Sequence, residues 1–176
     1  MWKIRKFSYN RLSISLLFNI YADRKNVRFL KTDPKARYQG YMFYFKEGFC
    51  WSNTLNPYAR LLKCRIKSKT INDVGAMSLT STIESVISNE EIVCLLNSNF
   101  VFDYYRNFIN NTVNIQINDI RQIPVKILRG EEKAKLTSLF YTAFDMRKSN
   151  RLSADEEKNI QSYLDNAIYD IYFCES

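Results

Sequence analysis

The chain has 176 residues, of which 46% are hydrophobic and 25% charged, and this length and composition predict one folded domain or one domain with a short appendage. It has no histidine, and its four glycines are too widely spaced for a phosphate-binding loop, which excludes Ser-His-Asp catalysis, His-ligated metals and the common nucleotide-binding motifs. Its net charge of +8 is uneven: residues 1–70 hold 16 Lys/Arg against 3 Asp/Glu and residues 71–176 hold 10 against 15, which favours a polyanionic partner for the first part over a merely solvated face or an acidic membrane surface.

Residues 1–80 are predicted to be rich in β-strands. Strand-forming residues fill segments 7–9, 13–21, 26–30 and 41–45, and a further strand is expected over residues 49–52. Residues 61–67 partly alternate, which would place Lys63, Arg65 and Lys67 in a row on one face of a strand. Such a row fits contacts with successive phosphates, although it is also typical of an ordinary solvent-facing strand.

After residue 88 the hydrophobic spacing becomes helical. Ser88 or Asn89 is expected to cap one long helix over about residues 89–109, in which Phe108 continues the apolar stripe. Residues 113–117 then alternate as a strand, with Asn114 and Gln116 on its polar face.

The C-terminal part is predicted to be a helical hairpin. The first helix covers residues 131–148, and the second starts at a capping box formed by Ser153 and Glu156. Its apolar face is expected to pack on the β-rich part or on a partner domain.

The four cysteines predict neither a zinc site nor a disulfide framework, because none belongs to a CxxC pair. We expect free thiols in the cytoplasm, with Cys94 in the core. No stretch approaches the ~20 apolar residues of a membrane span, so no membrane partner is expected.

Several segments, taken in order, resemble the C-terminal target-recognition region of adenine-specific DNA methyltransferases of type II and type IIG restriction–modification systems. Type I specificity subunits are more distant relatives. The segments are residues 44–52 (Tyr-Phe-Lys-Glu-Gly-Phe-Cys-Trp-Ser), 63–66, 95–100, 110–125 and 164–172, and the most specific part is residues 116–124 (Gln-Ile-Asn-Asp-Ile-Arg-Gln-Ile-Pro).

The resemblance implies a specificity domain that grips duplex DNA and reads its bases. A methyltransferase catalytic domain, in cis or in trans, would bind S-adenosylmethionine and methylate a flipped adenine. No catalytic or cofactor-binding residue is expected in this chain, since Asn56-Pro57-Tyr58 lacks the second proline of the family's Asn/Asp-Pro-Pro-Tyr/Phe motif.

The expected fold class is α+β, with a twisted antiparallel sheet followed by α-helices. A DNA target-recognition domain would cover residues 1–128, and the hairpin would cover residues 129–176.

The candidate DNA contacts are basic residues and the polar residues of one loop between matched segments. Thr54, Asn56 and Tyr58 are expected to read bases, and the cations to bind phosphates. Amides can bind adenine bidentately, but Asn114 and Gln116 belong to a shared motif, so a structural role at the helix–strand junction, through backbone hydrogen bonds, is preferred for them. The cations are Arg37, Lys46, Arg60, Lys63, Arg65, Lys67 and Lys69.

Two other functions stay open. A metal-dependent nuclease would need clustered carboxylates, whereas Asp103, Asp119 and Glu131 are scattered along the sequence. A non-catalytic interaction module of a defence system would have a basic face that is only solvated and would dock through its hairpin. Weaker partner binding after Tyr163→Asp or Ile168→Asp, with DNA binding unchanged, would favour that function.

Overall fold

The computed structural model describes Thr32, Phe43, residues 45–70, Asn72, and residues 75–83 and 86–174. Its backbone contacts divide the chain into two compact units, residues 1–44 and residues 45–176. The strands expected over residues 7–9, 13–21 and 26–30 lie outside the described residues, as do three residues of segment 41–45. The predicted hairpin, residues 129–176, lies within the second unit.

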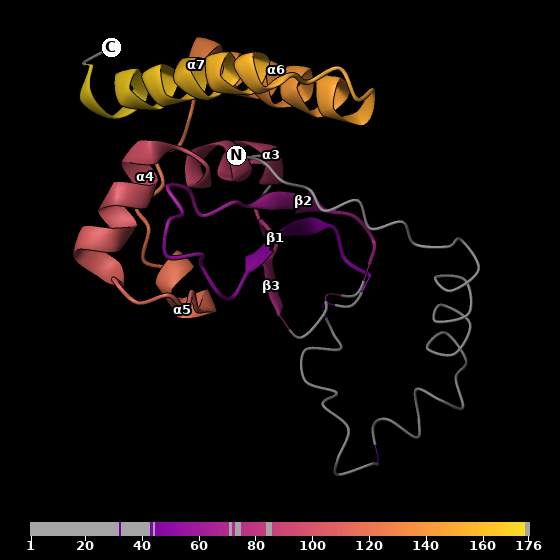
Figure 1. The fold of residues 1–176 in the computed structure, drawn as a ribbon, viewed down its shortest axis with the longest axis vertical. Helices are drawn as coiled ribbons and strands as arrows, with labels where there is room; N and C mark the ends of the chain where they lie inside the picture. The colour runs from indigo at the N-terminus through magenta and orange to yellow at the C-terminus, as the bar shows by residue number, and fades with distance from the viewer. Residues whose placement is uncertain are drawn as a thin grey trace. The chain divides into compact units, whose positions relative to one another are not determined.

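The second unit is α+β and begins with a three-stranded antiparallel sheet of order β2-β1-β3 (Figure 1). The central strand β1 (Gly48–Ser52) confirms the strand predicted there, and the sequence analysis named no strand at β3 (Ala76–Leu79). At Gly48 a Cβ atom would collide with the Leu79 carbonyl oxygen, so glycine allows β3 to approach closely.

The strand predicted over residues 61–67 is reduced to β2 (Arg65–Lys67). Lys63 takes a left-handed backbone conformation, with φ of 57°, which interrupts the extended chain before β2. The prediction that Lys63, Arg65 and Lys67 lie in a row on one face of a strand is therefore wrong.

The single helix expected over about residues 89–109 is three helices: α3 (Asn89–Leu96), α4 (Asn99–Tyr104) and the π-helix η2 (Tyr105–Ile109). The predicted start of α3 is confirmed, because Ser88 and Glu91 form a capping box.

The break between α3 and α4 has two causes. Both polar groups of the buried Asn97 amide bond the backbone of Cys64, at 2.8 Å each, and hold the end of α3 against the segment before β2. Ser98 Oγ then accepts the N–H of Val101 at 3.2 Å and caps α4.

Residues 113–117 do not form the predicted strand. Only Asn114 makes a β-bridge, to Thr54, and the chain then turns into the short helix α5 (Ile117–Ile120). The Asp119 carboxylate accepts the N–H of Gln116 at 2.8 Å, which fixes a helical turn where the alternation predicted an extended chain.

The predicted helical hairpin is confirmed as α6 (Gly130–Lys148) and α7 (Ala154–Phe173). The Ser153–Glu156 capping box that starts α7 is confirmed as well. No helix among the described residues has the length and apolar character needed to span a lipid bilayer.

Helix α3 lies between the sheet and the hairpin and has a hydrophobic core on each side (Figure 1). Val93 and Leu96 pack with Trp51 of the sheet, and this first cluster extends to α4, α5 and the loops. Cys94, buried as predicted, and Leu95 pack into a second cluster with residues of α6 and α7. The hairpin therefore packs on the β-containing part through α3.

Candidate nucleic-acid interface

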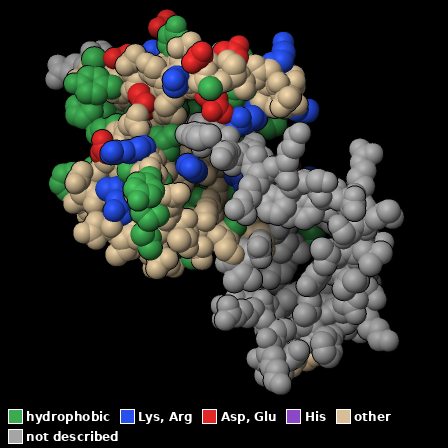
Figure 2. All heavy atoms as spheres, viewed as in Figure 1, with side chains coloured by type: hydrophobic (Ala, Val, Ile, Leu, Met, Phe, Trp, Pro, Cys, Tyr) green, Lys and Arg blue, Asp and Glu red, His purple; other side chains and the backbone are tan. Residues whose placement is uncertain are grey.

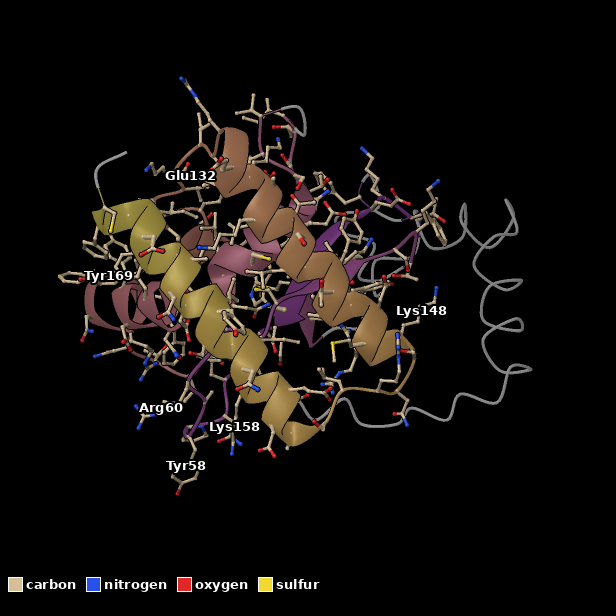
Figure 3. All side chains as sticks on the ribbon, turned by 90° about the horizontal axis from the view of Figure 1, so that it is seen from above. Tyr58, Arg60, Glu132, Lys148, Lys158 and Tyr169 are labelled. Carbon is tan, nitrogen blue, oxygen red and sulfur yellow. The ribbon has the colours of Figure 1, made fainter. Side chains whose placement is uncertain are left out.

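The loop between β1 and β2 presents the three predicted base-reading residues. Leu55 and Leu62 are buried at its two ends, which fastens it to the first core. Between them, Asn56 Oδ1 accepts the N–H of Tyr58 at 2.9 Å in a tight turn, and the Tyr58 side chain is 91% exposed. Figure 3 shows Tyr58 and Arg60 projecting outward on the same side. The loop thus offers an aromatic ring and a guanidinium to a partner.

The structure places nine of the ten predicted contacts, and Arg37 lies outside the described residues. Eight of the nine have exposed side chains, and Lys67 is buried. The exposed residues are Lys46, Thr54, Asn56, Tyr58, Arg60, Lys63, Arg65 and Lys69.

Lys67 is the contact that the structure corrects. Only 5% of this residue is exposed, and its Nζ donates a hydrogen bond to the carbonyl oxygen of Lys46 at 2.5 Å. Burial lowers the pKa of Lys67. An ammonium that is buried against the backbone cannot reach a phosphate, so the predicted phosphate contact at this residue is wrong.

The charge of the second unit is balanced in total but unevenly distributed along the sequence. Residues 1–44 hold 10 Lys/Arg against 2 Asp/Glu, whereas residues 45–176 hold 16 against 16. Within the second unit, residues 48–72 contain five Lys/Arg and no Asp/Glu. On the face seen in Figure 2, most Asp and Glu side chains gather over the α6–α7 hairpin. The β1–β2 loop and the residues after it therefore contribute exposed cations and no acid to a unit that is neutral in total.

A second loop, distant in sequence, lies beside the first. The N–H of Leu55 donates to Val113 O at 2.7 Å, and the N–H of Ile115 donates to Asn53 O at 2.9 Å. These two bonds flank the bridge between Thr54 and Asn114. The sequence analysis did not place these loops together.

The junction around residue 114 is held by its neighbours. Asn110 Nδ2 donates to Asn114 O at 3.0 Å and to Asp119 Oδ2 at 2.8 Å. The backbone groups of Asn114 and Gln116 take part in this network, as expected, but both side chains are exposed. Buried Tyr105 donates to the same Asp119 oxygen at 3.4 Å, and burial, followed by the nearby carboxylate, raises its pKa to about 12.

The π-helix η2 lies against the second loop through Arg106 and also exposes Phe108. Arg106 Nη1 donates to Thr112 O at 2.6 Å, which ties η2 to the second loop. Phe108 is 77% exposed, so its expected place in an apolar helical stripe is wrong. The wider turn of a π-helix shifts residues out of the α-helical register, and no local sequence signal marks it.

The carboxylates weighed for a nuclease do not converge. Asp119 is occupied by the junction network, and Asp103 and Glu131 are exposed on α4 and α6. The part of the chain that the structure describes contains no group of three or more Cys, Asp or Glu positioned to hold a metal ion.

Comparison with protein-family models, with curated proteins and with solved structures finds no match to this chain.

Proposed function

We propose that this chain is the sequence-specific DNA-recognition part of an adenine-N6 DNA methyltransferase or of a type IIG restriction–modification enzyme. The observation that carries the proposal is the β1–β2 loop with the strand that follows it. There Tyr58, Arg60, Lys63, Arg65 and Lys69 are all exposed, and the sequence has no acid between residues 48 and 72.

This arrangement suits a polyanion with bases. Exposed cations attract phosphates, and phosphate contacts supply affinity that is independent of sequence. An exposed tyrosine beside them offers a flat ring and a hydroxyl to a base edge or sugar. The excess of cations in residues 1–44 adds long-range attraction to the same kind of partner.

The sequence resemblance supplies the biological context of the proposal. The expectation of an α+β fold agrees with the small antiparallel sheet and the helices of residues 45–176. The catalytic domain, with its S-adenosylmethionine, would be a partner of this chain in cis or in trans.

Duplex binding by fluorescence anisotropy tests the proposal. If about four phosphate contacts form, affinity for a random duplex should fall about 100-fold between about 50 and 200 mM salt, because each contact releases counterions. Selection from a random duplex pool should then enrich one motif. No binding at the lower salt concentration would contradict the proposal.

An interaction module is the second candidate, and exposed aromatic residues on α7 favour it. Tyr163, Tyr169 and Phe173 are each more than half exposed. Exposed aromatic side chains are common in protein–protein interfaces. This candidate predicts that Tyr163→Asp weakens binding to a protein partner and leaves DNA binding unchanged.

A further inference from the structure

The two joined loops form a short antiparallel ribbon, residues 53–56 and 112–116, with an inner and an outer face. Leu55 and Ile115 point into the first core, and Ile115 is fully buried. Trp51 Nε1 also donates to the Ile115 carbonyl oxygen at 3.5 Å. Because side chains alternate along extended chains, Thr54 and Asn114, paired in the bridge, stand together on the outer face. The core thus holds the ribbon in place from behind.

The outer face of the ribbon is polar and carries no charge. All of its side chains are exposed and uncharged, and each can form hydrogen bonds. Residues 110–118 contain no charged residue at all. The side chains of this face are Thr54, Asn56, Thr112, Asn114 and Gln116.

Asn114 is the residue of this face best placed to bind a partner. Its carbonyl oxygen accepts bonds from Asn110 and Thr112, so the backbone is fixed. Among the hydrogen bonds of the described residues, none uses its side-chain amide, whereas the Asn56 side chain already accepts the N–H of Tyr58.

We infer that the outer face of the ribbon lies in the major groove and that Asn114 reads an adenine there. The inference rests on the proposed function. An amide matches adenine because its oxygen accepts from N6–H while its nitrogen donates to N7, and the major groove is wide enough for a two-stranded ribbon. Arg106, bound to Thr112, and Arg60, four residues beyond Asn56, are placed to contact the phosphates beside such a groove.

Base selection by the full chain tests this assignment. The wild-type chain should enrich a duplex motif that contains adenine at one position, and Asn114→Ala should lose about 10- to 100-fold in discrimination at that position alone. Its salt dependence should stay unchanged, since no phosphate contact is removed. Asn166→Ala, an exposed asparagine on α7, is the matched control and should enrich the wild-type motif.

A second variant keeps the test informative if the alanine variant folds poorly. Asn114→Asp has the same shape but cannot donate to adenine N7, and a carboxylate accepts from the amino group of cytosine instead. The preference at that position should therefore move from adenine towards cytosine.

The outcomes separate the inference from the proposed function. If both Asn114 variants enrich the wild-type motif, the assignment of Asn114 is overturned while DNA recognition stands. If the wild-type chain binds DNA without enriching any motif, base reading by the ribbon is overturned and the phosphate contacts stand. If the wild-type chain binds no DNA at low salt, the proposed function fails and this inference fails with it.

Discussion

Two surfaces of the second unit expose aromatic side chains, and the charges around them differ. Tyr58 belongs to a stretch of sequence, residues 48–72, that contains five Lys/Arg and no Asp/Glu. On α7, Tyr163 and Tyr169 share a helix that contains five Asp/Glu and one Lys. A surface rich in carboxylates repels DNA phosphates, so α7 is a poor candidate for the DNA-binding surface. The β1–β2 loop is therefore the better candidate for the proposed DNA contact, and α7 is left for solvent or a protein.

The two surfaces also share one support. Helix α3 contributes residues to the core beneath the loops and to the core beneath the hairpin. Damage to either core should therefore spread through α3, whereas changes at either surface should stay local. The predictions below separate these two kinds of change.

The largest expected effect concerns the hairpin core. Ile168 is fully buried, whereas Tyr163 on the same helix is 65% exposed. Ile168→Asp buries an unpaired carboxylate and should lower the free energy of unfolding by more than about 4 kcal/mol. Ile168→Asp is thus a folding variant and cannot probe a partner surface. Tyr163→Asp should change stability by less than about 1 kcal/mol. Urea denaturation followed by circular dichroism checks both, and equal effects would show that the hairpin does not pack as described.

A smaller loss is expected where α3 meets the segment before β2. Asn97→Ala leaves the N–H and the carbonyl of buried Cys64 without their partner. The expected cost is about 2–4 kcal/mol of unfolding free energy. The exposed Asn111→Ala should stay within about 0.5 kcal/mol of the wild type in the same denaturation experiment. A loss below about 1 kcal/mol for Asn97→Ala would mean that water or a shifted backbone replaces both bonds.

The features that sequence reasoning predicted well are local. The Ser88 and Ser153 caps and both hairpin helices depend on residues within a few positions of each other. The break between α3 and α4 depends on Asn97 reaching Cys64, 33 positions away, so helical spacing alone misses it. The turn at α5 depends on Asp119, which outweighs a short alternating pattern.

The candidate site shows the same division. A polar loop between strands predicts that Thr54, Asn56 and Tyr58 are exposed, and they are. Alternation also predicted that Lys67 is exposed, but the ammonium of Lys67 is held by the backbone of Lys46, two residues before β1. Asn114 lies beside Thr54 because the two residues form a β-bridge. They are 60 positions apart in the sequence, and no local pattern predicts that pairing.

Removal of exposed cations near Tyr58 in the sequence should weaken DNA binding, and this effect is intermediate in size among those predicted. The double variant Arg60→Gln/Lys63→Gln removes two exposed cations and should weaken random-duplex binding about tenfold at low salt, with the salt slope reduced by about 2. Lys148→Gln is the control, because this exposed lysine at the end of α6 lies apart from Tyr58 and Arg60 in Figure 3. An equal loss in the Lys148 variant would indicate attraction by net charge and not a defined contact surface.

The raised pKa of Tyr105 predicts that the free energy of unfolding falls modestly at high pH. Its pKa is raised from 10.0 to about 12 in the folded chain, so the folded state holds this proton more tightly than the unfolded state. The resulting stabilisation is fully present below pH 10 and is lost as the pH rises through 12, by at most about 1.4 kcal/mol per pH unit. Denaturation at pH 9 and pH 11 should show a smaller decline in Tyr105→Phe. A decline of equal size in that variant would assign the effect to other groups.

The smallest expected effect tests the correction at Lys67. If this lysine were one of three phosphate-binding cations in a row, Lys67→Met would weaken duplex binding and lower the salt slope by about 1. Because its ammonium is buried against Lys46 O, the variant should leave both quantities unchanged. Methionine keeps the long side chain and removes a desolvated charge, which offsets the lost hydrogen bond, so stability should change by less than about 1 kcal/mol. Anisotropy titrations of this variant and of Arg60→Gln/Lys63→Gln compare the loss of a buried cation with the loss of two exposed cations.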